Sequence, residues 1–317
     1  MKDTWGREIT YLRISLTDRC NLRCTYCMPP EGVKKRGHHQ ILTLEEIEEI
    51  AREAVALGVR KIRLTGGEPL VRRGILSLCR ALRQIPELKE LTLTTNGLLL
   101  PEMAADLKAA GVDRVNISLD SLDAEKYRRI TRGGSLEAAL AGIQAAKDAG
   151  LAPLKLNCVL IGGFNDDEIP ALVGLTEREP VEVRFIELMP IGHTAGFGPE
   201  AYLPCEAVLD RLPQLVPAEQ NSGVAERYRL PGAAGTVGLI RPLSRCFCGR
   251  CDRIRLTADG CLKPCLHSEE EIPLRGLHGQ TLRQRLEEAV RHKPEQHGEL
   301  SAQSPSQAAR NMNQIGG

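Results

Sequence analysis

The sequence predicts an α/β protein made of parallel strands and helical crossovers. Two observations support this class. Short runs rich in β-branched residues alternate with amphipathic segments from residue 9 to about residue 187, and glycines follow several of these segments where a helix would end. The six strand–helix units are fewer than the eight of a closed β/α barrel. A partial barrel or an open sheet is therefore expected.

The individual elements follow from local patterns. Six strands are predicted where apolar and β-branched residues are concentrated, over residues 9–16, 59–65, 90–95, 114–120, 154–161 and 182–188. The best-marked helix spans residues 43–57: Thr43 and Glu46 can form a capping box at its start, and Gly58 ends it. Further helices are expected near residues 72–84, 101–110, 136–149 and 166–178. Because strands and helices alternate, the strands should be parallel, with right-handed crossovers.

The pattern changes after residue 190. Glycine, proline and polar residues dominate 190–245, a cysteine-rich segment follows at 244–266, and an amphipathic helix is expected near 279–292. The chain then becomes polar and ends in two glycines. We therefore expect two domains, which span residues 1–190 and residues 191–317.

The composition excludes several classes of function. The chain has 317 residues, of which 42% are hydrophobic and 26% are charged, and its formal net charge is +1. Such a balance provides no field that would attract nucleic acid or an anionic membrane. We find neither a signal peptide nor an apolar run of the roughly 18 residues that a membrane span needs. A cytoplasmic protein is expected, in which 11 cysteines indicate metal binding or chemistry rather than disulfides.

Three cysteines stand together directly after the first predicted strand. Cys20, Cys24 and Cys27 form a CxxxCxxC motif at the carboxyl end of a strand, where parallel α/β sheets bind their ligands. Structural zinc sites take four protein ligands, usually from CxxC pairs. Three cysteines on a cubane iron–sulfur cluster instead leave one iron open to an outside ligand. The motif therefore favours a 4Fe–4S cluster.

This motif, with Tyr26 before its last cysteine, resembles that of the radical S-adenosylmethionine superfamily. The segment TGGEP at 65–69 is similar to the superfamily's GGE motif, whose glycines permit close backbone approach because they lack Cβ. The resemblance implies that the open iron chelates S-adenosylmethionine and that reductive cleavage yields a 5′-deoxyadenosyl radical. It also implies that the residues contacting this cofactor are Tyr26, Gly67, Ser118 and Met189.

Further motifs narrow the resemblance. They occur in order over nearly the whole chain: IRLTGGEPL, TTNGLLL, RVNISLDSLD, RFIELMPIG, FCGRCDRIRLTADG and a terminal IGG. Together they are similar to the GTP 3′,8-cyclases of molybdenum-cofactor biosynthesis. The resemblance implies a partial (βα)6 barrel whose open side is closed by a C-terminal region with a second 4Fe–4S cluster. It implies a reaction in which the radical removes hydrogen from the ribose 3′ carbon of GTP, which then bonds to carbon 8 of guanine.

A second set of cysteines lies in the C-terminal region. Cys248, Cys251 and Cys265 again offer three ligands, and in the family the open iron of this cluster meets the guanine. Cys246 and Cys261 are additional to this pattern, so the segment could alternatively hold zinc. The other cysteines are expected to be core thiols, namely Cys79 and Cys158, or have no motif around them, namely Cys205.

The triphosphate of GTP requires positive charge, and the sequence has no Walker glycine loop. Arginine is suited to the task because its guanidinium can contact phosphate through two parallel hydrogen bonds. Any one of these residues alone could be an ordinary surface charge, but several that converge on one cavity would form a polyanion clamp. The positions that match the family's GTP contacts are Arg13, Arg63, Thr94, Lys155, Arg253 and Arg255, with Arg184 as an additional candidate.

The two terminal glycines, Gly316 and Gly317, match a pair that in the family reaches the active site. A Gly–Gly end after a polar stretch would otherwise be expected to fray. The resemblance implies a catalytic role for the pair in positioning the reacting groups. Met312 and Ile315 are expected to hold the preceding segment against an apolar wall.

The resemblance also implies partners, and two other functions stay open at this point. The implied partners are GTP, an electron donor of unspecified identity, a second copy of the chain in a homodimer, and cyclic pyranopterin monophosphate synthase, which takes the product onward. One alternative is a radical enzyme that modifies peptides and carries an auxiliary cluster in its C-terminal region. The other is a metal-stabilised binding module without catalytic activity, which a redox-active cluster at the first cysteine set would exclude.

Overall fold

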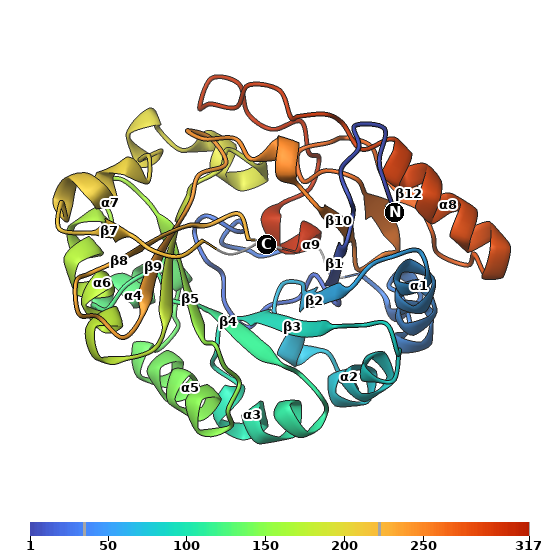
Figure 1. Cartoon of the computed structure of the whole chain (residues 1–317), viewed down its shortest axis with the longest axis horizontal. Helices are drawn as coiled ribbons and strands as arrows, with labels where there is room; N and C mark the ends of the chain where they lie inside the picture. The colour runs from blue at the N-terminus through green and yellow to red at the C-terminus, as the bar shows by residue number, and fades with distance from the viewer. Residues whose placement is uncertain (34–35, 221–222, 317) are drawn as a thin grey trace.

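A single curved sheet surrounds the centre of the molecule, and helices cover its outer side (Figure 1). The computed structural model describes residues 1–33, 36–220 and 223–316. Six parallel strands pair in chain order, and they are β1 (Tyr11–Ser15), β2 (Lys61–Thr65), β3 (Glu90–Thr95), β4 (Arg114–Ser118), β5 (Lys155–Leu160) and β6 (Glu182–Glu187). The helices that follow these strands are α1 (Leu44–Ala56), α2 (Ile75–Arg83), α3 (Leu100–Ala109), α4 (Ala124–Thr131), α5 (Leu136–Asp148) and α6 (Ile169–Arg178). The predicted α/β class and partial barrel are confirmed.

Alternate residues of the strands face opposite sides of the sheet, as β geometry requires. Leu12 and Ile14 of β1 are fully buried in the apolar core that the helices complete. Arg13, which lies between them, lines a cavity at the centre of the ring. The outer face of the sheet therefore stabilises the fold, and its inner face is left for polar side chains.

Side-chain caps mark the starts of α1 and α4. Thr43 Oγ1 accepts a hydrogen bond from the Glu46 amide at 3.1 Å, and the Glu46 carboxylate accepts one from the Thr43 amide at 2.7 Å. This reciprocal capping confirms the predicted start of α1. The prediction missed α4, although Asp123 caps it by accepting from the Lys126 amide at 2.8 Å.

The residues after 190 extend the same sheet at both of its edges. β9 (Thr236–Ile240) pairs in parallel with β6 and is followed outward by β8 (Glu226–Arg229) and β7 (Val216–Pro217). At the other edge, β10 (Arg253–Leu256) pairs in parallel with β1 and is followed by β11 (Cys261–Lys263) and β12 (Ile272–Pro273). Because one sheet runs across residue 190, the division into domains 1–190 and 191–317 stays a prediction.

Three further helices belong to the C-terminal part. They are α7 (Glu206–Arg211), α8 (Gly279–Arg291) and α9 (Met312–Ile315). α9 lies at the centre of the ring (Figure 1). Among the described residues, no helix is both long and apolar enough to cross a membrane.

Candidate active site

A cavity of about 620 Å³ occupies the centre of the ring. Both predicted cysteine sets line it, together with every residue expected to contact the cofactor or GTP. These are Arg13, Cys20, Cys24, Tyr26, Cys27, Arg63, Gly67, Thr94, Ser118, Lys155, Arg184, Met189, Cys248, Cys251, Arg253, Arg255 and Cys265. The fold thus brings residues from most of the chain to one place.

The first cysteine loop follows β1 and presents three free thiols to the cavity. The Leu22 amide lies 3.3 Å from Cys20 Sγ and the Asn96 side-chain amide lies 3.8 Å from it, so N–H groups already point at the sulfur. Burial raises the pKa of Cys20 to about 11 and that of Cys27 to about 12. A bound metal would offset this cost, since it deprotonates a coordinating thiol. The three donors therefore fit an iron–sulfur cluster with one open iron.

Gly66 and Gly67 pack against the backbone that leads into Cys20. Gly66 has φ +147°, and a Cβ there would lie 2.5 Å from the Thr17 carbonyl oxygen. A Cβ on Gly67 would lie 2.3 Å from the Arg19 carbonyl oxygen. The Gly67 amide also donates to the Thr17 carbonyl at 2.7 Å. The two glycines thus allow the close backbone approach that was expected, but between two segments of the protein itself. Contact between Gly67 and the cofactor stays a prediction.

Glu68, the acidic residue of the same motif, joins the ends of β2 and β3. Its buried carboxylate accepts hydrogen bonds from Thr95 Oγ1 at 2.8 Å, from the Asn96 amide at 2.8 Å and from the Leu70 amide at 3.0 Å. Burial raises the pKa of Glu68 to about 7. This residue was not singled out from the sequence, and its role here is to hold the cavity wall.

Tyr26 is fixed by a buried carboxylate. Its hydroxyl donates to Asp120 at 2.7 Å, and the other carboxylate oxygen of Asp120 accepts from the Val159 amide at 2.8 Å. Burial raises the pKa of Asp120 to about 6. Tyr26 therefore anchors the cysteine loop to groups at the ends of β4 and β5.

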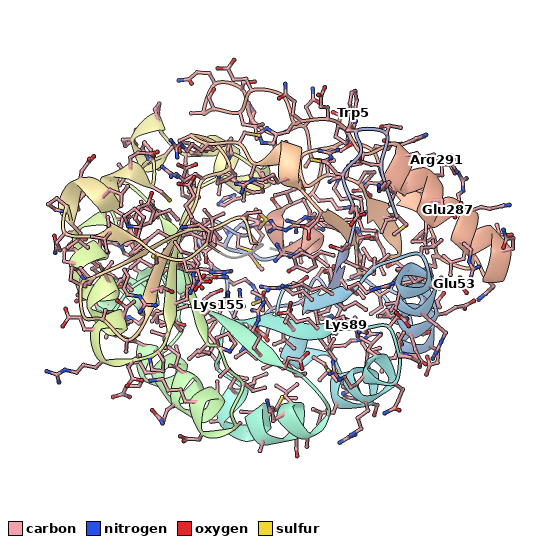
Figure 2. The ribbon with its side chains drawn as sticks, in the orientation of Figure 1. Trp5, Glu53, Lys89, Lys155, Glu287 and Arg291 are labelled. Atoms are coloured by element: carbon pink, nitrogen blue, oxygen red, sulfur yellow. The ribbon has the colours of Figure 1, made fainter. Side chains whose placement is uncertain are left out.

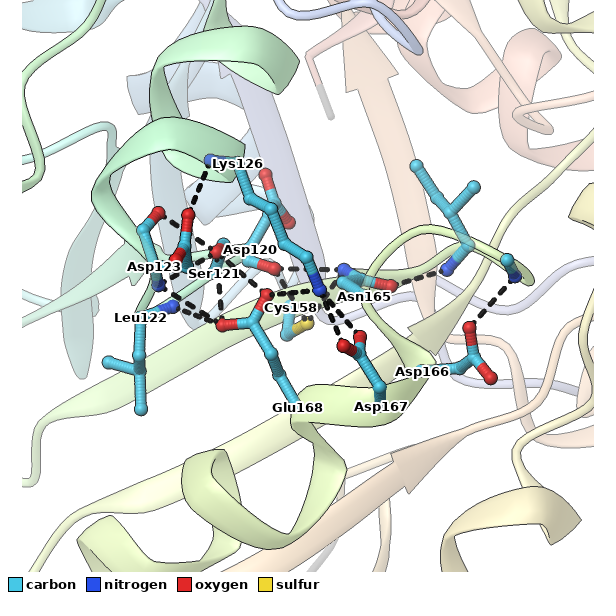
Figure 3. Close-up of polar contacts among 12 residues, drawn as sticks. Asp120, Ser121, Leu122, Asp123, Lys126, Cys158, Asn165, Asp166, Asp167 and Glu168 are labelled. Carbon is cyan, nitrogen blue, oxygen red and sulfur yellow. Dashed lines mark hydrogen bonds and ion pairs between the residues drawn. The ribbon is translucent and has the colours of Figure 1, made fainter.

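A polar network also holds the backbone around Asp120 (Figure 3). The Asn165 side-chain amide donates to the carbonyls of Asp120 and Val159, each at 2.9 Å. Glu168 accepts from Ser121 Oγ at 2.8 Å and from the Leu122 amide at 2.7 Å. The loops after β4 and β5 are thereby locked together, which fixes the position of this side of the cavity.

Three arginines stand side by side on neighbouring strands. Arg13 of β1 is in register with Arg255 of β10 on one side and with Arg63 of β2 on the other. Burial, with repulsion from Arg255, lowers the pKa of Arg13 to about 9. Burial likewise lowers the pKa of Arg63 to about 9 and that of Arg255 to about 10. Like charges on adjacent strands are destabilising, so this row indicates a site for a polyanion.

The arginine row, which we define as Arg13, Arg63 and Arg255, is only partly neutralised by the protein. Arg63 donates to Thr94 Oγ1 at 3.2 Å, while its Nε is buried without a hydrogen-bond partner among the described residues. The Tyr11 ring lies beneath three cations: its centroid is 4.9 Å from Lys61 Nζ and 5.8 and 5.5 Å from the guanidinium carbons of Arg63 and Arg253. An anion in the cavity would meet donors that are already positioned.

Lys155 and Arg184 differ from the row because they already have an acidic partner. Lys155 Nζ lies 3.3 Å from the Glu182 carboxylate, and Arg184 Nε also pairs with Glu182. Burial and the nearby Arg184 lower the pKa of Lys155 to about 7. Figure 2 shows Lys155 at the inner side of the ring. Contact of these two residues with GTP stays a prediction.

The second cysteine set lies beside positive charge. Although burial raises the pKa of Cys251, the charges of Lys293 and Arg253 lower it below its usual value. Lys293 Nζ donates to the carbonyls of Arg253 and Pro264, each at 2.8 Å. A negatively charged thiolate cluster suits this environment. Of the remaining cysteines, Cys79, Cys158 and Cys205 are buried, as the first two were predicted to be.

The C-terminal segment is docked inside the ring. Ile315 is fully buried against Ile191 and Ala308, with Met312 packed on the same cluster. The Gly316 carbonyl accepts a hydrogen bond from Arg255 of the arginine row. The residues up to Gly316 are therefore packed inside the ring and not frayed. Gly317 lies outside the described residues.

Several polar residues that line the cavity were not predicted, among them Tyr11, Asn116, Asp120 and Asn157. A signal was available for all four. Each lies two residues from a predicted contact on the same predicted strand, and a strand repeats its facing every two residues. For Asp120 that contact is Ser118, the last residue of β4, so Asp120 itself lies just beyond the strand.

Known families match nearly the whole chain. Residues 14–176 match the family described as the radical SAM superfamily, and residues 181–299 match the one described as Molybdenum Cofactor Synthesis C. A GTP 3′,8-cyclase of Alkaliphilus oremlandii is 50% identical over 100% of both chains. The GTP 3′,8-cyclase of Peptoclostridium acidaminophilum is 53% identical over 99% of this chain and 98% of its own. That of Pelotomaculum thermopropionicum is 53% identical over 100% of both.

Solved structures share the fold at low identity. Streptococcus suis SuiB bound to its precursor peptide SuiA superposes with a TM-score of 0.61, at 16% identity over 91% of this chain and 65% of SuiB. Methylornithine synthase has a TM-score of 0.51, at 20% identity over 65% of this chain and 62% of its own. The chain thus spans somewhat less than two thirds of the length of these structures, and the likeness concerns the fold alone.

Proposed function

The chain belongs to the radical SAM superfamily and, within it, to the GTP 3′,8-cyclase family; from this premise we propose that its central cavity converts GTP to (8S)-3′,8-cyclo-7,8-dihydroguanosine 5′-triphosphate, the first step of molybdenum-cofactor biosynthesis. The observation that carries the proposal is that one cavity joins two cysteine sets to the arginine row. Three adjoining buried arginines favour a nucleoside triphosphate over a peptide as the substrate, because the phosphate charge neutralises them.

The residues divide into three groups by what they would hold. Two 4Fe–4S clusters and S-adenosylmethionine, when bound, supply the 5′-deoxyadenosyl radical and an anchor for guanine. Cys20, Cys24 and Cys27 would hold the first cluster, and Cys248, Cys251 and Cys265 the second. The cofactor contacts would come from Tyr26, Gly67, Ser118 and Met189. The triphosphate contacts would come from Arg13, Arg63 and Arg255, with Thr94, Lys155, Arg184 and Arg253 around the same cavity.

The main contribution of the protein's side chains is to orient the cofactor and the substrate. Asp120 holds the first cysteine loop in place through Tyr26, and Glu68 fixes the neighbouring wall. The arginine row crosses β10, β1 and β2 within the strands, and Arg13 and Arg63 are the middle residues of β1 and β2. A substrate held there by its phosphates would present ribose and base at a set distance from both cysteine sets, which converts an encounter into an intramolecular reaction.

The proposal is tested by product analysis of the anaerobically reconstituted enzyme. With GTP, S-adenosylmethionine and a strong reductant, it should form 5′-deoxyadenosine and a 3′,8-cyclised nucleotide in equal amounts. ATP in place of GTP serves as the control, since adenine presents a different edge to the second cluster. Formation of 5′-deoxyadenosine with unchanged GTP would contradict the assignment.

Removing an arginine that faces the cavity should weaken GTP binding. Arg253→Ala and Arg255→Ala should each lose charge-assisted hydrogen bonds, which contribute about 1.5–3 kcal/mol apiece and thus roughly 10- to 100-fold in Kd. Equilibrium binding of GTP measures the loss. Cleavage of S-adenosylmethionine without GTP should continue, because its groups lie on the first cysteine loop.

The matched control for these variants is Arg83→Ala on α2. Arg83 is solvent-exposed and its guanidinium lies 3.4 Å from Asp113, so its loss should leave GTP affinity unchanged. Equal GTP affinity in all three variants would remove Arg253 and Arg255 from the substrate site.

Five finer features are part of the proposal. The enzyme acts in the cytoplasm, in keeping with its many unpaired thiols. It forms a homodimer, receives electrons from a separate donor, and passes its product to cyclic pyranopterin monophosphate synthase. The division into a barrel part, 1–190, and a C-terminal part, 191–317, belongs to the same proposal.

A further inference from the structure

Two sulfurs and one ring nitrogen gather beside the second cysteine set. The ligand atoms of Cys246, Cys248 and His297 all lie within 4.8 Å of one another. Cys246 precedes Cys248 on the loop after β9, whereas His297 comes from the segment after α8. The fold therefore brings a histidine from a distant part of the chain to a cysteine that the second cluster does not require.

The orientation of His297 leaves one of its nitrogens free to bind a metal. His297 Nδ1 lies 2.7 Å from the Gly298 carbonyl oxygen. A carbonyl can only accept, so Nδ1 carries the proton and Nε2 presents its lone pair. Nε2 is the nitrogen that faces Cys246. Metal-binding histidines commonly use their other ring nitrogen in this way, and the bond fixes both tautomer and ring position.

The spacing of Cys246 and His297 matches two ligands that share one metal ion. Cys246 Sγ lies 3.6 Å from His297 Nε2. Zinc bonds of about 2.3 Å to sulfur and about 2.1 Å to nitrogen, at a tetrahedral angle, place the two ligand atoms about 3.6 Å apart. Ligands on different irons of a cubane are separated by a cluster edge as well, so they stand farther apart. The pair thus fits a single ion better than two corners of a cluster.

We propose that Cys246, Cys248 and His297 bind one Zn²⁺ ion, with water in the fourth position. Cys246 is exposed, which provides an entry path for the ion, and two thiolates with one imidazole are ligands that zinc prefers. Cys248 is shared with the second cluster. Zinc and that cluster therefore exclude each other.

The first test uses Zn²⁺ alone with the full-length apoprotein. Cys20, Cys24 and Cys27 are changed to serine so that the first loop cannot bind the ion. Titration against a chromogenic zinc chelator should show one tight site per chain. Adding Cys246→Ser or His297→Gln should weaken it by more than about a hundredfold, above the range for loss of an outer-shell group.

Matched controls come from residues of the same kind nearby. Cys261→Ser and His292→Gln should leave zinc affinity unchanged, since neither residue belongs to the group. Co²⁺ in place of Zn²⁺ should give a thiolate-to-metal absorption band that weakens in Cys246→Ser. If zinc affinity is the same in all four variants, the ion binds elsewhere, for example at Cys251 and Cys265, and the proposal is overturned.

The second test asks whether bound zinc excludes the second cluster. It rests on the proposed second cluster. Loading wild-type apoprotein with one Zn²⁺ per chain before reconstitution should lower iron uptake by about four atoms. The same loading should not lower uptake in Cys246→Ser, which keeps all three cluster cysteines. Full iron uptake in zinc-loaded wild type would overturn the exclusion. A second set that takes up no iron even without zinc would count against the proposed function and leave the zinc site supported.

Discussion

Replacing Cys24 with alanine should abolish reductive cleavage of S-adenosylmethionine and lower the iron content from about eight to about four atoms per chain. Cys24 is the central ligand of the first loop, and its carbonyl accepts from the Cys27 amide at 2.9 Å. Two remaining thiols cannot hold a cubane with one open iron. The second set lies far away in the sequence, at Cys248, Cys251 and Cys265, and should keep its cluster. Iron analysis and 5′-deoxyadenosine formation under dithionite measure both effects.

Cys79→Ala is the matched control for this variant. Cys79 is a buried thiol on α2 and does not line the cavity, so both clusters and the cleavage reaction should persist. Production of 5′-deoxyadenosine by Cys24→Ala at the wild-type rate would show that the first loop does not hold the cluster that cleaves S-adenosylmethionine.

Changing the end of the chain should stop cyclisation without unfolding the protein. Gly316 has φ +77°, and a Cβ there would lie 2.2 Å from Thr65 Oγ1, so Gly316→Ala must displace the segment. Its carbonyl would then leave Arg255 of the arginine row. Deleting Gly316 and Gly317 should have the same effect. We expect cyclised product to fall by at least a hundredfold, in line with the cost of misplacing reacting groups.

Measurements of stability and of GTP binding should distinguish this loss of cyclisation from a general folding defect. The thermal midpoint of unfolding, the iron content and the affinity for GTP should stay close to wild type, because Ile315 and Met312 still pack on their cluster. Gly196→Ala is the control, since a Cβ there meets nothing within 4 Å. Cyclisation at the full rate by the Gly316→Ala enzyme would mean that the end of the chain takes no part in the reaction.

Most of the ring was predictable because its signals are local. The six strands fall within two residues of their predicted ends, since the β-branched runs and the glycines after helices both mark boundaries. α4 was missed because only Tyr127, Ile130 and Thr131 are buried on it, which is too short an apolar stripe for a periodic pattern. Its Asp123 cap was the one available signal.

The edges of the sheet could not be predicted in the same way. β10 pairs with β1 although the two strands are about 240 residues apart in the sequence, and no helix of fixed length joins them to reveal the pairing. β7 and β12 contain two residues each, so they show no alternation. Long-range pairing of short strands depends on the whole fold rather than on local sequence.

The candidate site was predicted in part. Motif spacing identified both cysteine sets, and the family resemblance identified Arg13 and Arg63 as candidate GTP contacts. Spacing could not reveal that Gly67 packs on the Arg19 carbonyl, nor that His297 reaches Cys246. Both contacts join segments whose distance in sequence carries no information about their distance in space.

The central claim is that the cavity holds GTP with its ribose 3′ carbon facing the radical. The most direct measurement uses GTP deuterated at that carbon, with unlabelled S-adenosylmethionine and the reconstituted enzyme. Mass spectrometry should find one deuterium in 5′-deoxyadenosine and none at the 3′ carbon of the cyclised nucleotide. Deuterium that stays in the nucleotide while 5′-deoxyadenosine accumulates would contradict the account, because the hydrogen would then come from another position or another substrate.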